Sequence, residues 1–469
     1  MRSKVLSAPL ALGLLLAGCA VGPDYHAPDL ALPEHYRVAP SEPAGPAAHA
    51  PWWRSFADPQ LDTLEAATMA QNLDLAQAAA RFDQARAAAH KAGVARLPAG
   101  EVTLGAAGIR QTLVDNAAVA RAFPFVGRDV EFYGAGVGAS WELDLFGGLG
   151  RSAEAARAEL EAAHADVAAA RLMLSAEVAD AYVRLRGAQQ RQAILDKQIA
   201  LLRNTAALVQ LKVDQGVAAR RDLDAAAAEL AQAKADRPPL AAEAEGELDR
   251  LSVLTGRRPE ADRGDLATAA AIPRPAPLPA GAPADLLRRR PDLIVAERRL
   301  AAANARIGAA ISEYYPKVDL QGVLGASSLN TGTLLAGPAG LAAVGLRWRL
   351  FDFGRVSDEV AAARSRDAEA LAAYQQAMLR AAADVEAALT ARLQSAEQAA
   401  RLADAEANLK RRTAATAEAY AAGGTSLLEL MDAERQLLSV EDQVIQAQVA
   451  QALAETALAR GTGARVGPD

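Results

Sequence analysis

Alternation of apolar residues with small or polar ones is clearest over residues 133–145. One alternate set there is apolar, whereas the intervening positions are glycine, serine or acidic residues. The same pattern returns over residues 342–350, and two partner segments, at about 102–110 and 318–325, alternate less cleanly. A period of two predicts β-strands that present one apolar face.

Helical periodicity occupies most of the remaining chain. Pro98 and Gly216 end two predicted helices of the first half, Gly187 predicts a weak break, and Gly423 and Gly424 interrupt the pattern in the second half. The predicted helical spans are 72–97, 150–215, 218–256, 291–316, 355–421 and 425–461. In each half the two shorter helices together match the long one, so they can stack end to end beside it. At 1.5 Å per residue such a rod is on the order of 100 Å long and needs lateral neighbours.

The two halves of the chain repeat each other. Asp74 recurs as Asp292 at an offset of 218, whereas Trp141 recurs as Trp348 at an offset of 207. The change of 11 residues between these matches indicates a loop insertion in the first half. Residues 257–283 are rich in proline, glycine and alanine and are predicted to be a linker.

The N-terminus has the features of an export signal. Two basic residues precede a short apolar run, and Leu16-Ala17-Gly18-Cys19 follows it. A plain signal peptide is the simpler interpretation. The box nevertheless resembles a bacterial lipobox, in which cleavage would leave Cys19 as the lipidated first residue, and Ala20 then favours the outer membrane.

Composition excludes several classes of function. A net charge of −7 argues against nucleic-acid binding, and a single cysteine with five scattered histidines leaves little for metal chemistry. The glycines at 134, 136 and 138 imitate a nucleotide-binding motif, but the strand pattern continues past them. The sequence contains no metalloprotease, serine-hydrolase or P-loop motif, so no catalytic site is expected. The expected modification is the covalent lipid on Cys19, with no cofactor and no metal.

Four strands cannot close a barrel, and an open sheet edge is not tolerated in lipid. If the strands cross a bilayer, the chain must therefore oligomerise, and three copies would supply twelve strands. A half-buried sheet in a soluble domain explains the alternation alone. The lipobox and the long helices favour the membrane.

These features together resemble the TolC-type outer-membrane factors, specifically the OprM-like (NodT) lipoproteins of RND efflux pumps. The matching segments are 19–28, 52–61, 141–147, 290–299, 350–354 and 420–435. The resemblance implies a mainly α fold with a membrane β-barrel: a homotrimer with a twelve-stranded barrel, four strands per chain, on a long α-helical periplasmic barrel.

The same resemblance implies an outer-membrane location and a domain organisation. Its expected partners are outer-membrane lipid, a periplasmic adaptor (membrane fusion protein) and an inner-membrane RND transporter. The expected parts are a signal peptide (1–18), a lipidated N-terminal equatorial segment (19–71), a first repeat (72–256), a linker and equatorial segment (257–290), a second repeat (291–461) and a tail (462–469).

A candidate gate lies on the helix after Gly424. Leu428, Glu429, Asp432 and Arg435 share the side opposite an apolar stripe at 100° per residue. A solvated helix face explains this pattern as well. In a trimeric tube, however, the acidic residues would form charged rings and Leu428 an apolar constriction, as in many pores.

The resemblance adds roles to particular residues. Leu428 and Asp432 match constriction residues of the OprM-like branch, and Glu429 with Asp432 matches an acidic pair of TolC. Tyr420 and Asp222 match a hydrogen-bonded latch between neighbouring coiled coils. The chain departs from TolC at Thr425, where TolC has an arginine, and Arg221 or Arg435 could replace it. Gly216, Gly423 and Gly424 are the expected hinges at which the tip opens.

The sequence leaves two other functions open. One is a TolC-like channel for type I secretion or metal export, and the other is a periplasmic coiled-coil scaffold lipoprotein. A scaffold explains the helices but leaves the alternating strands unexplained.

Overall fold

The computed structural model describes residues 20–29, 35–38, 50–110, 129–259, 263–334 and 337–467. Cys19 and the signal peptide lie outside the described residues, so the lipid attachment stays a prediction. Within these ranges, no helix is both long and apolar enough to cross a membrane.

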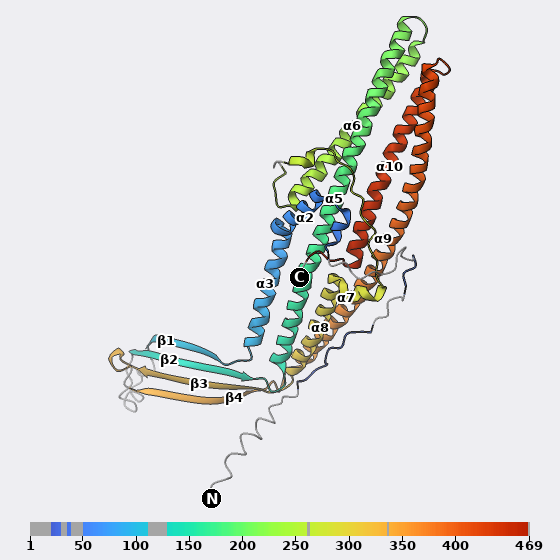
Figure 1. The fold of residues 1–469 in the computed structure, drawn as a ribbon. Coiled ribbons are helices and arrows are strands. Elements are labelled where there is room, and N and C mark those ends of the chain that lie inside the picture. The colour runs from blue at the N-terminus through green and yellow to red at the C-terminus, as the bar shows by residue number, and fades with distance from the viewer. Residues whose placement is uncertain are drawn as a thin grey trace, which may run out of the picture. The chain divides into compact units, whose positions relative to one another are not determined.

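The long helices fall close to the predicted spans (Figure 1). Each half contains one helix of 67 residues, α5 (Gly148–Asp214) and α9 (Arg355–Ala421), flanked by shorter helices. The others are α2 (Pro59–Gln71), α3 (Leu73–Val94), α6 (Arg220–Leu254), α7 (Leu286–Arg289), α8 (Pro291–Ser312) and α10 (Leu427–Thr462). Short 3-10 turns are η1 (Trp52–Phe56), η3 (Gly264–Ala267), η4 (Pro283–Asp285) and η5 (Thr331–Thr333).

The predicted weak break at Gly187 is wrong, because α5 continues through it. Gly187 lies where α5 packs on α10, and a Cβ atom there would come within 2.4 Å of Val449 Cγ2. Close helix packing therefore explains this glycine.

The four strands form one antiparallel sheet in the order β1-β2-β3-β4. They are β1 (Ala99–Arg110), β2 (Asp129–Leu143), β3 (Lys317–Ser328) and β4 (Pro338–Arg347). The four predicted strands are thus present, but their ends differ. In particular β4 stops at Arg347 instead of residue 350, because its partner β3 begins opposite, at Lys317.

Hydrogen bonds at equivalent positions show that the repeat is structural. Trp141 Nε1 donates to the carbonyl oxygen of Arg96 at 2.9 Å, and its counterpart Trp348 Nε1 donates to that of Tyr314 at 3.0 Å. Trp141 lies near the end of β2 and Trp348 directly follows β4, and each bonds to the short segment that precedes the neighbouring strand, β1 or β3. The two offsets found in the sequence therefore relate contacts as well as residues.

A second equivalent pair lies where the short helices meet end to end. Asn72 Nδ2 donates to the Leu254 carbonyl oxygen at 3.0 Å, and Arg290 Nη1 donates to the Gly461 carbonyl oxygen at 3.0 Å. Each bond ties the start of one short helix to the C-terminal turn of the other. The predicted end-to-end stacking is thus held by a side chain in each half.

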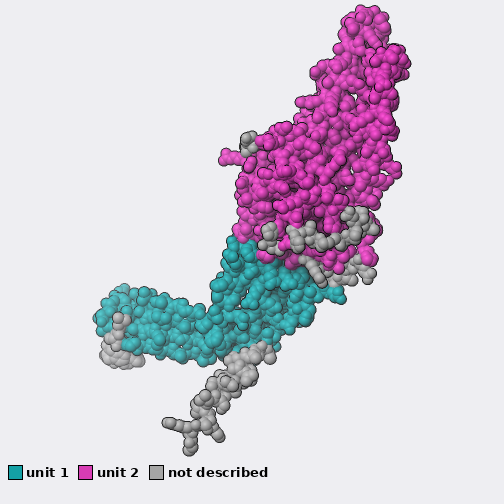
Figure 2. Space-filling view, in the orientation of Figure 1, with its two compact units in different colours: residues 1–29, 82–163, 296–374 teal, residues 30–81, 164–295, 375–469 magenta. Residues whose placement is uncertain are grey.

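The chain divides into two compact units, each of which draws on both halves (Figure 2). Residues 1–29, 82–163 and 296–374 form the first unit, which contains the sheet. Residues 30–81, 164–295 and 375–469 form the second.

The main core of the second unit surrounds the middle of α5. Trp52, Trp53 and Phe56 pack there with α2, and Ile272 from the linker and Val466 from the tail join them. The N-terminal segment, linker and tail thus meet in one core.

Buried Arg186 links three of these parts through polar contacts. Its guanidinium donates to the side chains of Gln60 on α2 and Gln189 on α5, and to the carbonyl oxygen of Thr268 in the linker. It also lies 5.0 Å from the ring centroid of Tyr182. Because a buried charge needs such partners, the network fixes the linker against α5.

Candidate functional site

Two helix–helix turns form the ends of the α5–α6 and α9–α10 pairs (Figure 1). We call residues 215–228 the first tip and residues 422–435 the second tip. Gly216 and Gly423 adopt left-handed conformations, with φ of 72° and 74°. The amides of Val217 and Gly424 donate back to carbonyl oxygens five residues earlier, at 2.9 and 2.8 Å. Two of the three predicted hinge glycines, Gly216 and Gly423, are therefore left-handed helix C-caps.

A Cβ atom added to either Gly216 or Gly423 would meet no neighbour within 4 Å. The backbone conformation, and not crowding, therefore explains both glycines. Gly424 differs, because its Cβ would lie 3.4 Å from the Ala419 carbonyl oxygen. The three expected hinge residues thus comprise one left-handed cap in each tip and one crowded position beside the second cap.

In the second tip, a capping box forms the start of α10. The amide of Glu429 donates to Ser426 Oγ at 3.2 Å, and the amide of Ser426 donates to Glu429 Oε2 at 3.5 Å. The hydroxyl of Thr425 also donates to Glu429 Oε2. Thr425, where the sequence departs from TolC, thus engages one of the acidic gate residues. The Ser-x-x-Glu spacing signals such a box, although the sequence analysis did not use it.

Asp432 is held by three side chains. Arg435 Nη2 lies 2.7 Å from Asp432 Oδ1, and Gln436 Nε2 donates to Asp432 Oδ2 at 2.6 Å. Arg412 of α9 completes the cluster: it lies 3.9 Å from Asp432 Oδ2 and donates to Gln436 Oε1 at 2.7 Å. Helical spacing could have indicated Gln436, whereas Arg412 is brought in only by the packing of α9 on α10.

Leu428 has no comparable packing, since it is 77% exposed. Elsewhere on α10, Ala433 is fully buried, and its carbonyl oxygen accepts from Thr413 Oγ1 at 3.2 Å. Thr205 of α5 donates to the sulfur of Met431 at 3.2 Å. The stripe residues Leu427, Leu430 and Met431 are half-buried, whereas Leu428, Glu429 and Arg435 are exposed.

Two of the three proposed latch residues, Tyr420 and Asp222, do not meet within one chain. Asp222 Oδ2 accepts from the amide of Ala219 at 3.3 Å, and its other oxygen lies 3.4 Å from Arg221 Nε. Tyr420 is partly exposed, and no hydrogen bond joins it to Asp222 in the described tips. Asp222 therefore caps its own helix in the isolated subunit.

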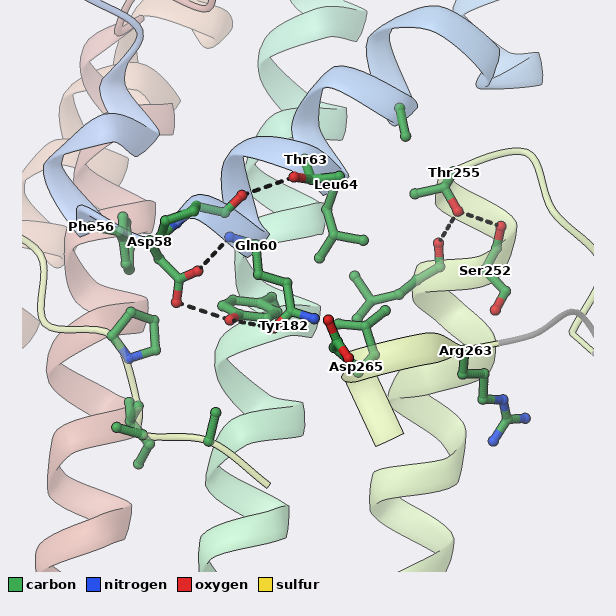
Figure 3. Close-up of a pocket in the computed structure, with 18 of the residues that line it drawn as sticks. Phe56, Asp58, Gln60, Thr63, Leu64, Tyr182, Ser252, Thr255, Arg263 and Asp265 are labelled. Atoms are coloured by element: carbon green, nitrogen blue, oxygen red, sulfur yellow. Dashed lines mark hydrogen bonds between the residues drawn. The ribbon is translucent and has the colours of Figure 1, made fainter. Parts of the chain in front are cut away.

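A cavity of about 710 Å³ lies away from the tips, between α2, α5, α6 and the linker (Figure 3). Tyr182 donates to Asp58 at 2.9 Å, while Asp58 accepts from the amide of Gln60 at 2.8 Å. Thr255 donates to helical carbonyl oxygens, one of them that of Ser252 at 3.0 Å. These polar groups serve helix ends and the junction with α5.

Comparison with known proteins decides the family. Residues 66–257 and 282–464 match the family described as outer membrane efflux protein. The chain belongs to this family. It is therefore an outer-membrane protein of a channel family, not a member of an enzyme family.

Relatives match over nearly the whole chain. Nodulation protein T of Rhizobium leguminosarum bv. viciae is 32% identical over 94% of this chain and 89% of its own length. The pyoverdine export outer membrane protein OpmQ of Pseudomonas putida is 29% identical over 97% of this chain and 96% of its own.

A solved structure of the outer-membrane channel OprN has a TM-score of 0.85 and 34% identity, and the match covers 96% of this chain and 100% of that chain. The fold class predicted from the sequence is confirmed: mainly helical, with four strands per chain, in the TolC-like class of trimeric barrels.

Proposed function

We propose that this protein is a homotrimeric exit duct of a tripartite RND-type efflux pump. It conducts small molecules passively out of the periplasm, through a gate formed by the second tip. The observation that carries the proposal is the open face of α10, where exposed Leu428 adjoins the acidic residues Glu429 and Asp432. The family membership supports it, and so does export by the relative OpmQ.

The gate's resting state follows from the contacts of Asp432. Arg435 and Arg412 offset its charge, so three copies can approach one another without unscreened repulsion. Hydrogen bonds of this kind contribute about 0.5–3 kcal/mol each, the charged ones most. A docked adaptor can therefore replace them at modest cost, and the tips then turn about Gly216, Gly423 and Gly424. Tyr420, Asp222 and Arg221 would form the latch between neighbouring subunits.

Planar-bilayer recording tests the gate directly. The double variant Leu428→Ala/Asp432→Ala widens the constriction and removes its charge, so single-channel conductance should rise several-fold, roughly as the open cross-section. Leu211→Ala is the matched control, because Leu211 is also exposed on a tip helix but lies outside the gate. Equal conductance of both variants and the parent would remove Leu428 and Asp432 from the gate.

Co-purification tests the partners. Crosslinking in intact cells, followed by isolation of the tagged protein, should recover a periplasmic adaptor and an inner-membrane RND transporter. Recovery of a type I secretion ATPase instead would change the assignment of the pump. Co-isolated RND transporters that select metal ions would assign the duct to metal export.

A further inference from the structure

The sheet has two free edges in the single chain. β1 and β4 are the outer strands, and each pairs on one side only. Both carry strongly exposed apolar side chains, such as Leu104 on β1 (80% exposed) and Leu346 on β4 (68% exposed). Unpaired edges are costly in lipid, so each edge needs a partner strand.

The internal repeat relates the strand pairs residue for residue. Shifting β1 by 218 and β2 by 207 converts the pair Ala99–Ser140 into Lys317–Arg347, which is the observed register of β3 with β4. The pair Gly108–Glu131 near the other end becomes Ala326–Pro338 by the same shifts, which is also observed, so the register is constant along the pair. The two hairpins are therefore equivalent units.

The same shifts applied to the β2–β3 junction define a pairing that no single chain contains. Ala139 opposite Gly322 becomes Leu346 opposite Leu104, which brings two exposed leucines together. Glu142 opposite Asp319 becomes Arg349 opposite Glu101, a pair of opposite charges. The transformed junction therefore joins apolar to apolar and basic to acidic positions.

The lengths of the strands point to the same missing neighbour. β2 extends to Leu143, three residues past its last partner on β1, because β3 pairs with those residues. β4 lacks the corresponding residues 348–350 and ends with its partner β3. An additional strand beside β4 would give residues 348–350 the backbone partners that β3 gives to residues 141–143 of β2.

An aromatic contact just beyond β2 likewise has no counterpart just beyond β4 in the described residues of the single chain. Phe146 stacks on Tyr315 with ring centroids 4.5 Å apart. The repeat places Phe353 and Leu97 in the equivalent positions, and both are open in the single chain, at 100% and 61% exposed. Phe353 also holds a positive φ of 54°, which a non-glycine residue rarely adopts. Phe353 and Leu97 are thus both exposed in the single chain, although their counterparts Phe146 and Tyr315 contact each other.

We propose that β4 of one subunit pairs with β1 of a second copy in the register that sets Leu346 opposite Leu104. Phe353 of the first copy then covers Leu97 of the second, and β4 extends through residue 350. The inference rests on the proposed homotrimer and adds to it the register of the junction. β1 and β4 cannot pair within one chain, because two strands separate them and four strands do not close a barrel.

Cysteine crosslinking of the assembled protein tests the register. The parent has a single cysteine, Cys19. If the oxidised parent forms no crosslinked species, any crosslink in a variant comes from the introduced cysteine pair. Leu346→Cys/Leu104→Cys should yield covalent dimers and trimers on mild oxidation, because directly opposite Cβ atoms lie about 4.5–5.5 Å apart. The control Leu346→Cys/Ile109→Cys displaces one thiol by five residues, about 16 Å along the strand, and should stay unlinked.

Native mass measurement before oxidation tests the proposed trimer separately from the proposed register. A trimer that links through Ile109 but not through Leu104, or through neither, overturns the register and leaves the proposed function standing. A protein that is monomeric in detergent overturns both. Leu97→Cys/Phe353→Cys should link between subunits as well, and its failure in an intact trimer would contradict the aromatic part.

A charge exchange gives a second readout if a cysteine variant fails to assemble. Glu101→Arg and Arg349→Glu should each lower the fraction of trimer that survives mild heating in detergent. The double variant should recover the part of the loss that comes from the junction, because it restores opposite charges there. The ion pair of Arg349 with Glu313 inside the chain, at 3.1 Å, stays broken in it. Strictly additive losses would contradict the pairing of Glu101 with Arg349.

Discussion

The two tips share one backbone and differ in side chains. Gly216 and Gly423 cap their helices in the same left-handed conformation, 207 residues apart. At the same offset, Ala219 of the first tip corresponds to Ser426 of the second, Arg221 to Leu428 and Ala225 to Asp432. The turn is therefore a property of the duplicated fold, whereas the candidate gate belongs to the second tip alone.

This difference separates two physical requirements. A reversal between long helices needs a left-handed residue and satisfied carbonyl groups, which both tips provide with the same hydrogen bonds. A constriction needs an apolar side chain beside acidic ones on an open face. Leu428 and Asp432 provide these in the second tip, whereas the first tip has Arg221 and Ala225 at the same positions. Four predictions test this separation.

The largest expected effect concerns ion block. Polyvalent cations added on the periplasmic side should block the channel at the acidic rings. Glu429→Gln/Asp432→Asn should weaken that block by about tenfold or more, because the rings lose their charge. Bilayer recordings with hexamminecobalt measure it. Glutamine can still serve at the third position of a capping box, so the helix end is preserved.

Asp222→Asn in the first tip is the matched control for this experiment. Its block should change less than about twofold, since Asp222 is engaged with Arg221 and its own helix end. If both variants weakened cation block equally, acidic rings would be present in both tips, which would contradict the proposed difference between them.

Replacement of the cap glycines should affect the two tips equally. Gly216→Ala and Gly423→Ala each force alanine into a left-handed conformation, which costs about 1–2 kcal/mol. Hydrogen exchange should show the adjoining helical turn opening about 5–30 times more often in each variant. A cost confined to one tip would show that side chains, and not the shared turn, stabilise that reversal.

Swapping the residues at the capping position should change the stability of the two tips in opposite directions. Ser426→Ala removes the side-chain cap of α10 and should destabilise the second tip by about 1 kcal/mol, while Ala219→Ser should stabilise the first by a similar amount. Amide exchange of residues 220–223 and 427–430 provides the comparison. Two changes of the same sign would mean that the caps are not equivalent.

The smallest expected effect is a pH dependence of the second tip. Burial raises the pKa of Glu434, whereas its counterpart in the first tip is Ala227. A raised pKa contributes stability that is fully present below the unfolded pKa of about 4.5 and is lost as the pH rises through the folded value. Protection of the second tip relative to the first should therefore decline across that interval.

Glu434→Gln isolates this contribution. The glutamine variant should show a shallower decline in relative protection than the parent, after correction for the intrinsic pH dependence of exchange. An identical decline in the two proteins would assign the effect to other groups of the second tip.

Local pattern was sufficient for most of the fold. Period-two alternation located all four strands, and helical periodicity located both 67-residue helices to within a few residues. It misjudged Gly187, because the pattern shows that a residue lacks a side chain but not which neighbour requires the space. It also extended β4 to residue 350, because alternation continues where the in-chain partner stops.

For the candidate site, the sequence determined which residues share a face of α10, since a helix has a fixed angle per residue. It also determined the duplication and the glycine of each tip, because both follow from residue identity at a constant offset. Tertiary structure alone decided the contact of Arg412 with Asp432 and the separation of Asp222 from Tyr420. Those contacts depend on how separate helices are packed together, and nothing local in the chain specifies that distance.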